Sequence, residues 1–171
     1  MRRFLGFVVL ASSALALVGF GATTGPLKPG DRIGAMTLSR GTAATADWKL
    51  FDTCDPVILR AGTYRRRCAQ VGRVRRLFIG YGLFAAPREI GRVWAETTWR
   101  AWFDARPLAL QRFGTSDRML YAFPPAGGKN VTLREWRVML VGVTPGRHTL
   151  RYRMRDAAGT TDATWTFTVT R

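Results

Sequence analysis

The sequence predicts an all-β fold, a sandwich of about seven strands with one short helix and an irregular N-terminal extension. Two observations carry this prediction. The closing stretch, residues 143–170, alternates apolar and polar residues with the period of a strand. From residue 77 onward, short apolar runs are separated by turn formers at short intervals. The length of 171 residues, of which 47% are hydrophobic, is enough for one domain with a real core.

The closing stretch predicts two antiparallel strands joined by a loop at 156–162. In its first half, three apolar residues alternate with three arginines: Leu150, Tyr152 and Met154 with Arg151, Arg153 and Arg155. In its second half, Trp165, Phe167 and Val169 alternate with threonines. Each apolar set is therefore expected to face the core, and the arginines are expected on the outer face.

The remaining strands of the sandwich are expected between residues 77 and 143. The predicted strands are residues 77–84, 97–103, 108–112, 118–123 and 130–143, with 113–117 as a turn. Gly80 and Gly82 interrupt the first of these and suggest a bulge or a close backbone contact. Residues 86–96 fit a short helix, with Pro87 at its first position and Ile90, Val93 and Trp94 on one face.

The N-terminus resembles an export signal. Arg2 and Arg3 precede an apolar stretch that has no charge until Lys28, and small residues follow the apolar stretch. This pattern predicts a signal peptide over residues 1–22. The alternative is an uncleaved membrane anchor, because the uncharged run is long enough to span a bilayer. Both alternatives place the rest of the chain outside the cytoplasm.

Residues 27–75 are predicted to form an irregular extension with short strands, closed by a disulfide. Their apolar runs are short and are interrupted by Pro and Gly, without a clear period. The chain has two cysteines, Cys54 and Cys68, and an even pair in an exported protein predicts a disulfide. Closing this loop would stabilise the protein by about 3 kcal/mol in the chain-entropy model.

Two motifs resemble a known family. Residues 145–159, which begin P-G-R-H-T-L and end D-A-A-G, and the following W-T-F-T-V at 165–169 are similar to the last two strands of bacterial immunoglobulin-like and fibronectin type III-like domains. Residues 102–108 resemble the Asp-Gly hairpin of such domains, with Ala105 where glycine is usual, and His148 stands where a tyrosine is common. The resemblance implies an immunoglobulin-like sandwich over residues 76–171, an extracytoplasmic location and a role in adhesion, scaffolding or binding. It implies no catalytic residues.

The residues that could carry catalysis or bind metals are few. Beyond the predicted signal the chain has two serines, Ser39 and Ser116, and one histidine, His148. Ser116 lies in no nucleophile-elbow motif, and a histidine at the start of a strand is expected to be structural. One histidine and a paired cysteine set cannot form a usual transition-metal site. We therefore predict no enzyme activity, no metal and no cofactor.

Paired carboxylates provide the remaining chemical alternatives. Asp52 lies close to Asp55 in the sequence, and Asp156 lies close to Asp162. Both pairs fall in predicted turns, where aspartate usually bonds to the backbone. A calcium site at either loop is left open, and so is a small secreted hydrolase of unknown type.

Positive charge is the strongest functional signal. The formal net charge is +16, and residues 56–88 contain eight arginines and no acidic residue. Arginine binds phosphate and carboxylate groups through two hydrogen bonds, which suggests an anionic partner. The alternative is a solvated sheet face that discourages edge pairing. The candidate polyanion-binding residues are Arg65, Arg66, Arg67, Arg73, Arg75, Arg76, Arg151, Arg153 and Arg155, and Arg147 could extend the same stripe.

These observations favour a non-enzymatic module that is secreted or held at the cell surface. Its expected partner is an anionic cell-envelope polymer or a membrane surface, and nucleic acid is not favoured for an exported protein. A protein partner and the oligomeric state are left open. The tryptophans are mostly in phase with apolar neighbours and are expected in the core, whereas Trp102 is out of phase and is expected on the surface.

Overall fold

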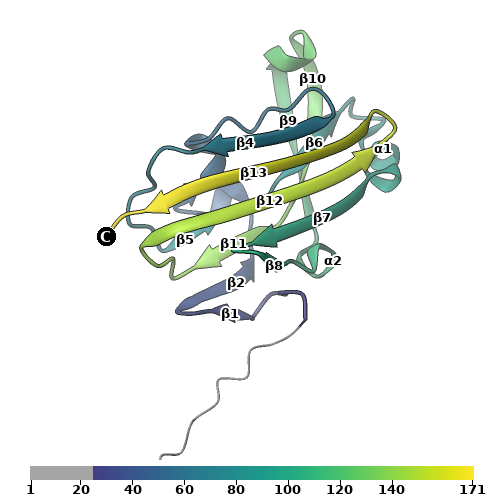
Figure 1. The fold of residues 1–171 in the computed structure, drawn as a ribbon. Helices are drawn as coiled ribbons and strands as arrows, with labels where there is room; N and C mark the ends of the chain where they lie inside the picture. Colours follow the sequence, from purple (N-terminus) through teal and green to yellow (C-terminus); the bar gives the residue numbers. More distant parts are fainter. Residues whose placement is uncertain (1–24) are drawn as a thin grey trace, which may run out of the picture.

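The computed structural model describes residues 25–171, so the predicted signal peptide or anchor at 1–22 lies outside the described residues. The fold is mostly β, which confirms the all-β prediction. Figure 1 shows one sheet across the front and the other strands behind it. Within residues 25–171, no helix is both long enough and apolar enough to cross a membrane.

The front sheet contains the closing hairpin and has five strands. Their order across the sheet is β4 (Gly62–Arg67), β13 (Gly159–Val169), β12 (Gly146–Asp156), β7 (Thr98–Phe103) and β8 (Arg106–Pro107). β12 and β13 pair in antiparallel register from Gly146 opposite Val169 to Asp156 opposite Gly159. β4 joins the outer edge of β13 and runs parallel to it.

The second layer is built around two neighbouring segments of chain, residues 76–85 and residues 129–141. One end of this layer has the order β1 (Arg32–Ile33), β2 (Met36–Arg40), β11 (Val138–Val141), β5 (Arg76–Phe78) and β3 (Trp48–Lys49). The other end has the order β6 (Gly82–Ala85), β10 (Lys129–Trp136) and β9 (Thr115–Phe123). The backbone N–H of Ile79 donates to the carbonyl of Val138 (3.0 Å), and Trp136 donates to Tyr81 (3.0 Å), so the pairing continues between the two ends.

The glycines at 80 and 82 allow this continuous pairing. A Cβ at Gly80 would lie 1.9 Å from the carbonyl oxygen of Trp136, and a Cβ at Gly82 would lie 1.8 Å from that of Arg134. No side chain fits at such distances. The close backbone contact predicted from these glycines is therefore confirmed.

The helical segments are short. They comprise α1 (Ile90–Glu96), α2 (Leu110–Phe113) and three 3₁₀ turns, Ala43–Thr45, Leu50–Asp52 and Pro124–Ala126. The predicted helix is thus present, but it begins at Ile90 rather than at Pro87. Ile90 is its buried residue, and Trp94 packs against Trp99 and Trp136.

Three local predictions were wrong. The predicted strand at 108–112 is replaced by α2, whose Leu110 and Phe113 enter the core. The predicted turn at 113–117 overlaps β9, which begins at Thr115. The loop predicted at 156–162 is shorter, because Asp156 already pairs with Gly159, and Asp162 therefore lies inside β13.

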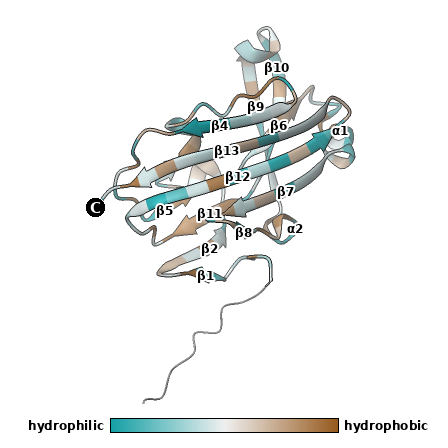
Figure 2. Cartoon of the chain, viewed as in Figure 1, coloured by the Kyte–Doolittle hydropathy of each residue, from teal (hydrophilic) through white to brown (hydrophobic). Residues whose placement is uncertain are grey.

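The core lies between the two layers and includes residues from both. Leu38 and Leu140 come from the second layer, and Leu150 and Trp165 come from the front sheet. The inward and outward residues of β12 and β13 follow the predicted alternation. Figure 2 shows hydrophilic residues alternating with more hydrophobic ones along β12.

Residues 27–75, predicted as an extension, contribute strands to both layers. Their β2 pairs with β11, and their β4 pairs with β13. Leu27, Leu50 and Val71 are fully buried in the same cluster as the residues that follow position 76. The predicted disulfide between Cys54 and Cys68 is present, with 4.6 Å between the two Cα atoms.

The β7–β8 hairpin has an unusual turn. Asp104 has a φ of 45° and Ala105 a φ of 64°, a backbone region that favours glycine. Phe103 pairs with Arg106 on either side of these two residues. Residues 102–108 therefore form the tight hairpin that their resemblance to an Asp-Gly turn implies, with an alanine in the strained position.

Replacing Ala105 with glycine is expected to raise the free energy of unfolding by about 0.5–1 kcal/mol, because glycine adopts positive φ without a Cβ clash. Chemical denaturation of Ala105→Gly beside the parent protein measures this change. The matched control is Ala157→Gly in the β12–β13 turn. Ala157 does not have a positive φ, so its replacement should lower stability by about 0.5 kcal/mol. A loss of stability in Ala105→Gly would contradict the strain.

Candidate functional site

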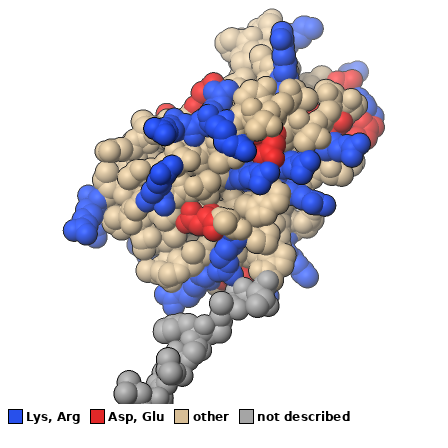
Figure 3. All heavy atoms as spheres, in the orientation of Figure 1, with Lys and Arg blue, Asp and Glu red and all other residues tan. Residues whose placement is uncertain are grey.

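The outer face of the front sheet gathers seven arginines, and we call this set the arginine face. Outward positions follow from the burial of Leu150 and Tyr152 on the opposite side of β12 and from the register of the neighbouring strands. The set consists of Arg65 and Arg67 on β4, Arg100 on β7, and Arg147, Arg151, Arg153 and Arg155 on β12. Figure 3 shows basic side chains spread over this face with few acidic ones among them.

Asp162 is the carboxylate within the strands of the arginine face, and Asp104 lies at the edge of this face beside Trp102, Thr149 and Arg151. Asp162 on β13 accepts a hydrogen bond from Nε of Arg151 (2.8 Å) and a second, shorter one from the same guanidinium. Arg65 approaches it to 4.0 Å. The hydrogen bonds from Arg151 hold the pKa of Asp162 below its usual range, so this carboxylate stays charged.

Asp162 also fixes the position of Arg151. The guanidinium of Arg151 lies 4.9 Å from the centre of the Trp102 ring, as a cation–π contact. Trp102 is half-buried on the outer side of β7, which agrees with its predicted surface position. The centre of the face is therefore held rigid by side-chain contacts.

The other arginines of the face are available to a partner. Arg67, Arg100, Arg147, Arg153 and Arg155 are exposed, and within the described residues none of them forms a hydrogen bond or an ion pair. β13 lies between β4 and β12, and its outward residues other than Asp162 are threonines: Thr160, Thr164, Thr166 and Thr168. The face thus presents free guanidinium groups and hydroxyl groups at the regular spacing of the strands.

The structure brings together five of the nine predicted polyanion-binding residues. Arg65, Arg67, Arg151, Arg153 and Arg155 share the arginine face. Arg66 alternates to the other side of β4, where it pairs with Asp55 and lies 5.8 Å from the ring of Tyr64. Arg73 and Arg75 lie in the segment between β4 and β5, outside the strands of the arginine face, although Val71 of the same segment bridges Val169 at the end of β13.

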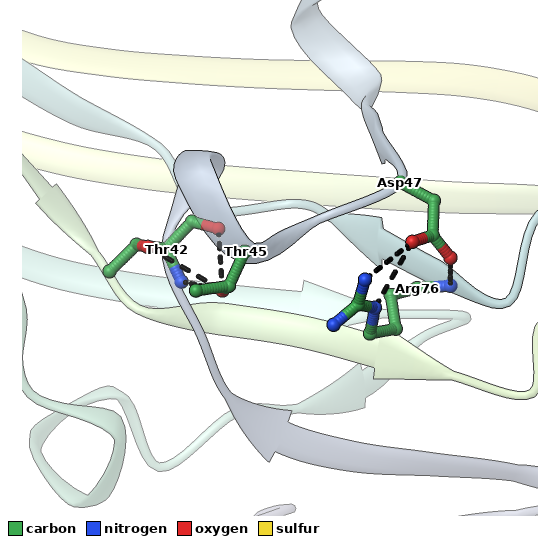
Figure 4. Close-up of polar contacts among 4 residues, drawn as sticks. All are labelled: Thr42, Thr45, Asp47 and Arg76. Atoms are coloured by element: carbon green, nitrogen blue, oxygen red, sulfur yellow. Dashed lines mark hydrogen bonds and ion pairs between the residues drawn. The ribbon is translucent and has the colours of Figure 1, made fainter.

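Arg76 is the ninth predicted residue, and it is bound to Asp47. Nε and Nη2 of Arg76 donate to one carboxylate oxygen of Asp47 at 3.1 and 2.7 Å, and its backbone N–H donates to the other at 2.9 Å (Figure 4). These bonds lower the pKa of Asp47. Arg76 therefore joins β5 to the segment before β3 and is not part of the face. Arg100 belongs to the face but was not predicted, because only the pairing of β7 with β12 places it there.

His148 is buried beneath one corner of the front sheet, where 6% of its surface is exposed. Its Nδ1 lies 2.8 Å from Oδ2 of Asp104, and its Nε2 lies 3.1 Å from the carbonyl oxygen of Thr144. Both partners are acceptors, so the protonated ring, which has two donors, satisfies both. The bond to Asp104 raises the pKa of His148, and its ring stacks on Phe103.

The predicted catalytic alternatives do not assemble around His148. Ser116 lies on β9 in the second layer, whereas the ring nitrogens of His148 are already bound to Asp104 and Thr144. Asp52 pairs with Lys49, and Asp156 accepts the backbone N–H of Ala158 (2.8 Å) within its turn. Over residues 25–171, no group of three or more His, Cys, Asp or Glu side chains could hold a metal ion.

A second feature, a groove of about 530 Å³, was not foreseen from the sequence. Its walls come from the segment before β4, from β6, β9 and β10, and from the β12–β13 turn. Most lining residues are apolar, but Glu135 on β10, which carries a carboxyl group, also lines the groove. Burial raises the pKa of Glu135.

Comparison with known proteins gave no match to a family model, to a curated protein or to a solved structure. The fold and the surface chemistry therefore carry the functional argument.

The pKa of His148 leads to a pH dependence of stability. Because its pKa is higher in the folded than in the unfolded protein, its contribution is complete below the unfolded value of about 6.5. The contribution is lost as pH rises through the folded pKa. The stability difference between the parent and His148→Gln should therefore be larger at about pH 5.5 than at about pH 8.5.

Denaturation curves of both proteins across this range measure the difference. His148 is the single histidine of the chain, so other groups that titrate here are common to both proteins and cancel. A difference that does not change with pH would show that His148 is not charged in the folded state.

Proposed function

We propose that this protein is a non-enzymatic binding module that contacts an anionic cell-envelope polymer or lipid headgroups through the arginine face. The observation that carries the proposal is the ratio of charges, with seven arginines and one carboxylate, Asp162, among the outward residues of β4, β7, β12 and β13. Concentrating one sign of charge on a face costs energy because like charges repel, and an anionic partner would offset this cost.

The spacing of the arginines suits an extended ligand. Residues two apart on a strand lie about 7 Å from each other, and neighbouring strands are about 4.8 Å apart. Arg147, Arg151, Arg153 and Arg155 therefore form a row of about 27 Å along β12. A row of this length matches a repeating set of phosphate or carboxylate groups better than one small anion. Guanidinium groups bind such oxygens in pairs, and the threonine hydroxyls add donors.

The location that the sequence predicts is compatible with such a partner. The Cys54–Cys68 disulfide is typical of proteins outside the cytoplasm, where thiols are not kept reduced. Secretion through the signal at 1–22, or anchoring by the same segment, would place the arginine face near anionic polymers of the envelope and lipid headgroups. The immunoglobulin-like character of the sandwich stays a prediction that agrees with a binding role.

The proposal is tested by reversing three free arginines of the face, in Arg67→Glu/Arg153→Glu/Arg155→Glu. Binding of the parent to a polyanionic polysaccharide and to phosphatidylglycerol vesicles should weaken steeply as salt increases. The triple variant should lose at least about tenfold in affinity at about 0.05 M salt, with a shallower dependence on salt. Titration calorimetry and vesicle co-sedimentation measure the two ligands and distinguish polymer from lipid.

The matched control carries the same change of charge elsewhere on the surface, in Arg32→Glu/Arg73→Glu/Arg75→Glu. These exposed arginines lie outside the front sheet. The control should retain most of the affinity. If both triple variants weaken binding equally, total charge and not the arginine face is responsible. If the parent binds neither ligand at low salt, the proposal fails.

A further inference from the structure

The groove opens between the two layers at the end of the molecule that carries the β12–β13 turn. Met154, Ala158 and Thr161 line it from the front sheet, and Phe84, Leu120 and Leu133 line it from the second layer. The segment 56–61, just before β4, forms a further wall. Its volume of about 530 Å³ falls in the range of pockets that bind small molecules, which are mostly apolar with a few fixed polar groups.

Glu135 is the most buried of the charged residues that line the groove, with 7% of its surface exposed. β10 directs Glu135 to the same side as Leu133, opposite Gly82 of β6 and Ser116 of β9. Within residues 25–171, its carboxyl group accepts no hydrogen bond and forms no ion pair. Arg118 and Lys49 act on it only through space. The groove gives a donor access to this carboxyl group, and a charge-assisted hydrogen bond is stronger in such a poorly solvated place than at an exposed one.

The other charged residues of the groove lie at its rim. Arg60 and Arg118 are exposed, and Asp156 is half-buried and bound to the backbone of its own turn. Water screens these groups far more than it screens Glu135. A charged end of a molecule inserted into the groove therefore meets Glu135, and most of the remaining wall is apolar.

We propose that the groove binds an apolar molecule that carries a single primary amine, with the amine donating hydrogen bonds to the buried carboxylate of Glu135. An ammonium group supplies both the missing donors and the opposite charge, and charge-assisted hydrogen bonds are about twice as strong as neutral ones. The apolar body displaces water from Phe84, Leu120, Leu133 and the other apolar walls. This site is separate from the arginine face and does not rest on the function proposed above.

Three probes of equal chain length test the site: decylamine, decanol and decanoate. Each is titrated into the full chain below its micelle concentration and followed by calorimetry. Decylamine should bind at least about tenfold more tightly than decanol, because only the amine pairs with a carboxylate. Decanoate should bind most weakly. Decanoate binding as tightly as decylamine would overturn the proposal, since the rim arginines would then determine the ligand. Failure of all three probes to bind would also overturn it.

Glu135→Gln removes the charge and keeps the shape of the side chain. This variant should lose the preference for decylamine over decanol while still binding decanol. The matched control is Glu96→Gln on α1, which changes the net charge equally at an exposed residue paired with Arg92. Glu96→Gln should bind all three probes as the parent does. Unchanged decylamine binding by Glu135→Gln would refute the role of Glu135.

Leu133→Trp fills the groove and should weaken decylamine and decanol alike. Thermal unfolding and circular dichroism of each variant show whether it is folded, so that lost binding is not mistaken for lost structure. Polymer and vesicle binding by Glu135→Gln should equal that of the parent. That measurement separates a failure of the groove from a failure of the arginine face.

Discussion

The pairing of β12 with β13 is the constraint on which the rest of the structure depends. Eleven residue pairs fix the register, and the inner side of the two strands places Leu150, Tyr152, Trp165 and Phe167 in the core. Because side chains alternate between the faces of a strand, the same register fixes every outward residue. A slip of one position would bury arginines and expose tryptophan. Burial of the aromatic residues therefore also determines where the positive charges lie.

Most of the features that could be predicted depend on residues that lie near one another in the sequence. The alternation in 147–169 predicted both the core side of the hairpin and three arginines of the outer face. The disulfide followed from two cysteines in a chain with a predicted export signal. Pairing between distant segments was not predictable in this way. Arg100 joins the face only through β7, and Arg66 and Arg76 are held by Asp55 and Asp47, which no local pattern connects to them.

The errors have a common physical cause. Leu110 and Phe113 were expected in a strand and a turn, but spacing of three residues lets both reach the core from one turn of helix. The burial of Glu135 was not predicted, because a single glutamate within a strand normally faces water. Glu135 is buried between segments that are distant in sequence, since β6, β9, β10 and the β12–β13 turn all line the groove beside it. Such a feature depends on the three-dimensional arrangement of both layers and has no local signature.

The parallel pairing of β4 with β13 has a consequence for how the chain folds. Gly62 pairs with Thr161, so the edge strand of the front sheet has no partner until almost the whole chain is available. Contacts between such distant segments form late, because the intervening loop must first lose its freedom. The Cys54–Cys68 bond closes a loop that contains β4, because Cys54 precedes the strand and Cys68 follows it directly. If the chain reaches an oxidising compartment before the sheet is complete, the disulfide would restrain the segment around β4 before β13 pairs with it.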